Sequence, residues 1–149
     1  MEELRIGPWR VRYDAAATRR AYEHIRHGGA EECRCSTCRN YIAARSSAFP
    51  AEFLRLLERL GVDPAKERES YYVQAAAPGR HVYSGWFHFV GEVVEGPAEV
   101  LALGERFHFY ITNETALVPE AFAGKAVAQI EFTTEVPWVT RDAEPQAMG

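Results

Sequence analysis

The hydrophobic period of this sequence changes near Tyr71. Before that point apolar residues recur every three or four positions, as in the stripe of Phe53, Leu56, Leu57 and Leu60, which is the spacing of an amphipathic helix. After it, aromatic and β-branched residues alternate with polar ones, which is typical of half-buried strands. Helices that come first and strands that follow one another favour an antiparallel sheet. The sequence therefore predicts an α+β fold, with an antiparallel sheet of about five to six strands and three N-terminal helices packed on one face.

Residues typical of helix termini bound these three helices. Asp14 can cap the first helix with its side chain, and the pair Gly28-Gly29 is expected to end it. Ser36 is the expected cap of the second helix. Pro50 suits the first position of the third helix, and Gly61 suits the left-handed residue after its last turn.

The predicted strands are short runs separated by glycine or proline. Pro8 near the start of the first run suggests an edge strand, and Gly104 suits a type II′ turn that joins two later strands in a tight hairpin. Phe87 and Phe89 share one face of their strand and are expected in the core. A short helical turn is expected over 119–124. The strand candidates are 5–13, 71–75, 81–94, 98–103, 106–112, 127–135 and 137–139.

Length and charge limit the classes of protein that this chain can belong to. Its 149 residues, 47% of them hydrophobic, suit one domain, which we expect over 1–140 with a disordered polar tail over 141–149. No apolar run approaches the ~18 residues of a membrane span, and the first residues lack the pattern of a signal peptide, so no membrane contact and a cytoplasmic location are expected. The net charge of −4 disfavours nucleic acid as a partner.

The cysteines are the strongest chemical signal in the sequence. Cys33, Cys35 and Cys38 lie within six residues, and the two-residue gap before the last of them is typical of a zinc knuckle. Three thiolates leave one position of a tetrahedral zinc ion open, and His27 is the best candidate for a fourth ligand. The sequence thus predicts one zinc ion. The other histidines considered for the fourth position are His24, His81 and His88.

Thiol chemistry is an alternative use of the same atoms. Cys35 and Cys38 would open a helix, where unpaired amides and the helix dipole lower the pKa of a thiol and favour disulfide exchange. A thioredoxin-type motif, however, follows a strand, whereas here a helix and two glycines come first. Cysteines without a special role are the third alternative.

A resemblance to a family accompanies this cluster. The segments Cys33-x-Cys35-x-x-Cys38-Arg39-Asn40, Phe49-Pro50-Ala51-Glu52-Phe53, Leu60-Gly61-Val62-Asp63 and Gly85-Trp86-Phe87-His88-Phe89-Val90-Gly91 resemble an uncharacterised family of small bacterial proteins. The resemblance extends over about residues 14–91, and its most specific part is the run G-W-F-H-F-V-G. It implies a bacterial origin and a single domain, and it brings no reaction, ligand or cofactor with it.

Polar and aromatic residues on two strands suggest a ligand-binding surface. Trp86 and His88 share one face of their strand, and His108 and Tyr110 alternate with apolar residues on a later strand. If the two strands are neighbours, these four side chains line one concave surface. The alternative is a mixed polar and aromatic sheet face that binds nothing.

No motif in the sequence specifies a reaction or a small-molecule ligand. A nucleophile elbow, a phosphate loop, a Rossmann glycine fingerprint and H-E-x-x-H are all absent from it. The first hypothesis for function is therefore a zinc-stapled binding or protein-interaction module. The alternative is a thiol- or metal-dependent enzyme that uses Cys33, Cys35 and Cys38, for which zinc would need an open fourth position.

Overall fold

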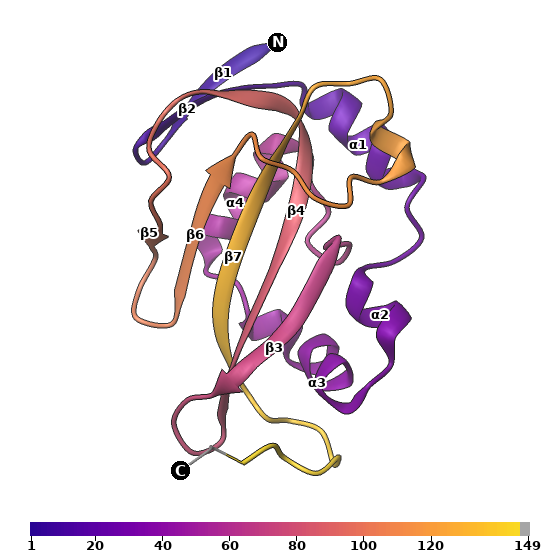
Figure 1. Ribbon diagram of the computed structural model, residues 1–149, viewed down its shortest axis with the longest axis vertical. Coiled ribbons are helices and arrows are strands. Elements are labelled where there is room, and N and C mark those ends of the chain that lie inside the picture. The colour runs from indigo at the N-terminus through magenta and orange to yellow at the C-terminus, as the bar shows by residue number, and fades with distance from the viewer. Residues whose placement is uncertain (147–149) are drawn as a thin grey trace.

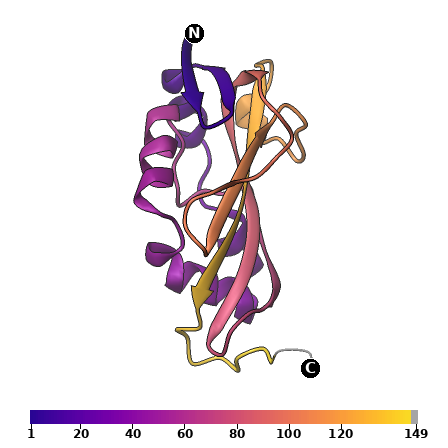
Figure 2. The ribbon, with the colours of Figure 1, turned by 90° about the vertical axis from the view of Figure 1, so that its left-hand side faces the viewer.

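The computed structural model describes residues 1–146. They form an antiparallel sheet, and the α-helices are layered on one of its faces (Figure 2). Within these residues the sheet has seven strands: six follow the order β1-β2-β4-β7-β6-β5, and the seventh, β3, pairs with β4. None of the helices in this part of the chain is long and apolar enough to cross a membrane. The elements are β1 (Glu2–Ile6), β2 (Trp9–Tyr13), α1 (Ala15–Glu23), α2 (Gly29–Cys33), α3 (Ser36–Ala44), η1 (Arg45–Ser47), α4 (Ala51–Leu60), β3 (Glu69–Ala75), β4 (Arg80–Glu95), β5 (Leu101–Ala102), β6 (Phe107–Thr112), η2 (Glu120–Phe122) and β7 (Val127–Pro137).

Strand β4 is the centre of the sheet (Figure 1). It is 16 residues long, and its residues 80–90 pair along one edge with β7, while β3 and β2 share the other edge. In the described part of the chain, residues 87–90 have no strand partner on this shared edge. Helix α1 lies there instead, and the hydroxyl of Thr18 accepts a hydrogen bond from the N–H of Val90 at 2.9 Å. The sheet edge is thus completed by side chains of a helix.

The core between the helices and the sheet is aromatic. Phe53 of α4 and Phe87 of β4 are both 0% exposed, which confirms that Phe87 lies in the core. The ring of Phe53 lies 4.7 Å from that of Phe107, measured between centroids, and the ring of Phe87 lies 5.5 Å from that of Phe132. Aromatic pairs at such separations stabilise a core beyond the effect of the buried area alone.

Several of the predicted helix termini are confirmed. Asp14 caps α1 by accepting from the N–H of Ala17 at 2.9 Å, and the N–H of Val62 donates to Leu57 at 2.9 Å beyond the left-handed Gly61. The cap of α3 is Cys35, whereas Ser36, predicted as the cap, is the first helical residue.

One helix is additional to the three that the sequence predicts. Gly28 and Gly29 do not end α1, as predicted: α1 stops at Glu23, and the two glycines begin the short helix α2. A glycine can serve at the N-cap as well as at the end of a helix, so the glycine pair alone did not distinguish the two. The structure confirms the α+β class and the antiparallel sheet.

The strands differ from the prediction mainly at the edges of the sheet. The predicted strand 5–13 is not one strand but contains the end of β1, a turn and the whole of β2. Gly7, with a φ of +52°, lies in this turn, and β1 pairs with β2. Of the predicted strand 98–103, only β5 pairs with a neighbouring strand. The turn that joins it to β6 is one residue longer than predicted, because the N–H of Leu103 donates to the carbonyl of Phe107 at 3.0 Å. The run 137–139 is no separate strand: Pro137 ends β7.

Candidate metal centre

The three cysteines lie at the junction of α2 and α3. Cys33 is the last residue of α2, Cys35 caps α3, and Cys38 lies in the first turn of that helix. Their Sγ atoms all lie within 4.8 Å of one another. Cys33 and Cys35 are exposed and Cys38 is buried, so the cluster has one side against the protein and one side toward solvent.

Hydrogen bonds converge on the sulfur of Cys35. Its Sγ lies 3.3 Å from the Sγ of Cys33, 3.3 Å from the Oγ1 of Thr37 and 3.4 Å from the N–H of Cys38. Burial raises the pKa of the Cys35 thiol, but these hydrogen bonds outweigh burial and lower the pKa to about 6. Burial and the neighbouring thiols raise the pKa of Cys38. The hydrogen bonds thus favour the thiolate form at Cys35 rather than at Cys38.

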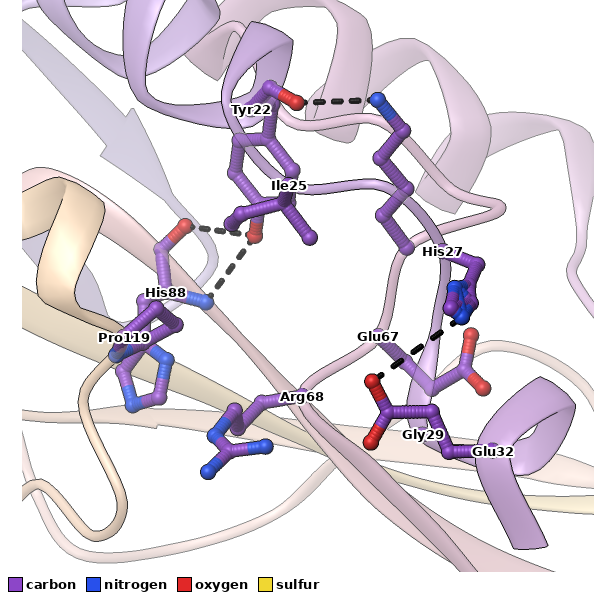
Figure 3. A pocket seen from close by; sticks show the side chains of 10 residues that line it. Tyr22, Ile25, His27, Gly29, Glu32, Glu67, Arg68, His88 and Pro119 are labelled. Atoms are coloured by element: carbon purple, nitrogen blue, oxygen red, sulfur yellow. Dashed lines mark hydrogen bonds and ion pairs between the residues drawn. The ribbon is translucent and has the colours of Figure 1, made fainter.

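The structure brings together the three predicted sulfur ligands but not His27. Among residues 1–146, no histidine or carboxylate joins the group of three sulfurs. The Nε2 of His27 lies 4.0 Å from the Oε1 of Glu32 (Figure 3). His24 is exposed, and the Nε2 of His81 is hydrogen-bonded to Glu144 at 2.7 Å. A histidine as the fourth metal ligand therefore stays a prediction, since none of these histidines joins the three sulfurs.

His27 lines a separate small cavity of about 80 Å³ (Figure 3). His88 lies in its wall, and of the four residues predicted to form a ligand-binding surface only His88 lines this cavity. The Oε1 of Gln129 accepts from the N–H of Ala116 at 2.8 Å and also contacts the Nε2 of His88 at 3.0 Å, so this Nε2 carries the proton. Burial lowers the pKa of His88 to about 4, which keeps the ring neutral.

The other three predicted ligand-binding residues lie on the outer face of the sheet. Strand β7 separates the two strands that carry them, so Trp86 and Tyr110 lie on either side of Glu131, and His108 lies opposite Thr133. All three are half-buried. The indole of Trp86 donates to the carbonyl of Ala116 at 3.2 Å. The four residues therefore do not converge on one pocket.

Sequence reasoning missed the residues that follow the cysteines. Asn40 is fully buried, its Nδ2 donates to the carbonyl of Pro137 at 3.1 Å, and its Oδ1 accepts from the N–H of Val139 at 2.7 Å. Arg39 forms two hydrogen bonds of 3.0 Å to Asp142. The Arg-Asn pair was part of the motif noted in the sequence, but nothing in the sequence indicated a partner near the C-terminus.

The described C-terminal segment has defined contacts. Asp142 binds Arg39 and Glu144 binds His81 within the predicted tail 141–149, of which residues 147–149 lie outside the described part of the chain.

A comparison with protein-family models, curated proteins and solved structures finds no match to this chain. The resemblance to a bacterial family stays a prediction, and a function has to be argued from the cysteine cluster itself.

Proposed function

We propose that this protein is a zinc-binding module in which Cys33, Cys35 and Cys38 hold one ion and staple α2 to α3. The observation that supports the proposal is the convergence of three Sγ atoms within 4.8 Å. A tetrahedral zinc ion with bonds of about 2.3 Å to sulfur needs sulfurs about 3.8 Å apart. The Sγ atoms of Cys33 and Cys35 are 3.3 Å apart and all three lie within 4.8 Å, so small side-chain rotations would meet this requirement.

The open side of the cluster supports a role in binding a partner. Because Cys33 and Cys35 are exposed, a fourth donor can approach the ion from solvent. A side chain of a partner protein, or water in its absence, would complete the coordination. The ion would thereby both stabilise the helix junction and contribute to the interaction surface.

A second candidate function is a thiol- or metal-dependent enzyme. The exposed Sγ atoms of Cys33 and Cys35, 3.3 Å apart, favour it, since both are accessible to a substrate. An open zinc position is also what catalytic zinc sites retain. The two candidates share the same residues and differ in whether the thiols are bound to metal and whether the open position takes a substrate or a partner.

Metal analysis of untagged protein tests the proposal. About one equivalent of zinc is expected, with loss of zinc on replacing Cys33, Cys35 and Cys38 by Ser. Zinc should be retained in Ser36→Ala, which changes a residue between the cysteines without removing a sulfur. In the cobalt-substituted protein, added imidazole should shift the visible absorption bands if the fourth position is open. Metal-free protein with three reactive thiols would reject the zinc module and favour thiol chemistry.

A further inference from the structure

The spacing of the cysteines depends on an unusual backbone conformation between them. Arg34 has a φ of 60°, in the left-handed region that residues other than glycine rarely adopt. This conformation reverses the chain between α2 and α3 and brings the Sγ atoms of Cys33 and Cys35 to 3.3 Å. Some contact must therefore hold Arg34 in place, since the conformation costs free energy.

Arg39 supplies that contact. Its Nη1 donates a hydrogen bond to the backbone carbonyl of Arg34. The remaining donors of the guanidinium face the other way, where Nε and Nη2 bind the two carboxylate oxygens of Asp142 at 3.0 Å each. The hydrogen bonds from Arg39 lower the pKa of Asp142. Such a bidentate ion pair fixes the plane of the guanidinium as well as its position.

The segment that carries Asp142 is itself bound to α3. The Oδ1 of Asn40 accepts from the backbone of Val139 at 2.7 Å and of Thr140 at 3.3 Å. The indole of Trp138 then donates to the carbonyl of Asp142 at 2.9 Å, which closes residues 138–142 into a compact turn. Residues 137–142 are therefore attached directly behind the cysteine-bearing turn.

Building on the proposed zinc site, we infer that Arg39 is a positioning residue of the cysteine cluster and that the C-terminal residues 137–142 hold it there through Asp142. The order of this segment then sets the affinity of the cluster for metal. Thermodynamic linkage makes the coupling reciprocal, so a bound ion also favours the attached state of the segment. A partner that displaced the segment would weaken metal binding at a site that it does not touch.

The test measures zinc affinity of the full-length protein by competition with a chromophoric chelator. Asp142→Ala is expected to weaken zinc binding about 5-fold or more, the lower end of typical coupling between sites, and Asp142→Glu is expected to restore part of it. Glu144→Ala is the matched control, because Glu144 follows the same segment by two residues but contacts His81. Circular dichroism of each variant verifies that it is folded.

A readout without metal separates this inference from the proposed function. In metal-free protein, the buried thiol of Cys38 should react several-fold faster with an aromatic disulfide reagent in Asp142→Ala than in the wild type, and unchanged in Glu144→Ala. If the wild type binds no zinc but this difference appears, the zinc proposal fails and the positioning role of Arg39 stands. The positioning role is wrong if Asp142→Ala and Glu144→Ala have the same thiol reactivity and, provided that the wild type binds zinc, the same zinc affinity.

Discussion

The hydroxyl of Tyr22 takes the place of a neighbouring strand for His88. It donates to the backbone carbonyl of His88 at 2.9 Å and accepts from the backbone N–H of the same residue at 3.2 Å. Tyr22 is on α1, and His88 is in the stretch of β4 that neither β2 nor β3 reaches. A buried backbone group without a partner costs free energy, so this single side chain satisfies two groups that a strand would otherwise have to satisfy.

Removing this hydroxyl should destabilise the fold. We expect Tyr22→Phe to lower the free energy of unfolding by about 1–3 kcal/mol, because two buried backbone groups lose their partner while the ring stays. Urea denaturation measures the difference. Tyr71→Phe, at an exposed tyrosine of the same sheet, is the control and should change stability by less than about 0.5 kcal/mol. An equal effect of the two substitutions would contradict the role of Tyr22.

The aromatic core makes a second prediction about stability. Phe87→Ala should lower the free energy of unfolding by about 3–5 kcal/mol, because it leaves a cavity between Phe49, Phe53 and Phe132. Val139→Ala, at a half-exposed residue, is the comparison for the same measurement. A loss within about half a kcal/mol for Phe87→Ala would mean that the core packs differently.

Burial of His88 predicts how stability depends on pH. The pKa of His88 is about 4 in the folded protein against 6.5 for an unperturbed histidine, so the unfolded chain binds the proton first as the pH falls. The contribution is constant above pH 6.5, and stability is lost as the pH falls from 6.5 to about 4, by about 3 kcal/mol in total. Urea denaturation across this window should show the loss in the wild type and in His24→Gln. The slope should be reduced in His88→Gln, and an unchanged slope would assign the pH dependence to other groups.

The proposed zinc staple predicts a local response to chelation. Amide hydrogen exchange should accelerate over about residues 24–45 when zinc is removed, while the strands over 71–135 keep their protection. The reason is that the sheet and its aromatic core need no metal to form. The triple Cys→Ser variant should show no response to the chelator. Loss of protection throughout the sheet would mean that the ion anchors the whole domain, and no change anywhere would remove the staple.

The parts of this fold that the sequence predicted have local causes. The cap at Asp14 and the terminus at Gly61 depend on residues within five positions of each other, and the structure has both. The closeness of the three sulfurs belongs to the same class, because six residues of chain keep the cysteines near one another, whereas the proposed support from Asp142 is distant in sequence. Short-range geometry was sufficient for each of these.

What could not be predicted depends on distant contacts. Arg39 and Asp142 are 103 positions apart, and the pairing of β7 between β4 and β6 separated residues that sequence alternation had grouped together. His27 is close to the cysteines in sequence, yet helix α2 lies between them, and His27 lines a cavity that the cysteines do not line. Proximity along the chain indicates proximity in space only where no further element lies between the residues.

The central place of β4 also determines the order in which the chain can assemble during synthesis. After the β1–β2 hairpin, the four α-helices of the described residues leave the ribosome before β3 to β7, and none of them exceeds ten residues. Isolated helices below about 12–15 residues are marginal in water, so they cannot persist until β4 and β7 emerge to cover their apolar faces. Throughout this interval Cys38 lacks the surroundings that bury it in the native protein. The thiols of the nascent chain are thus accessible to a metal ion or an oxidant before the sheet exists.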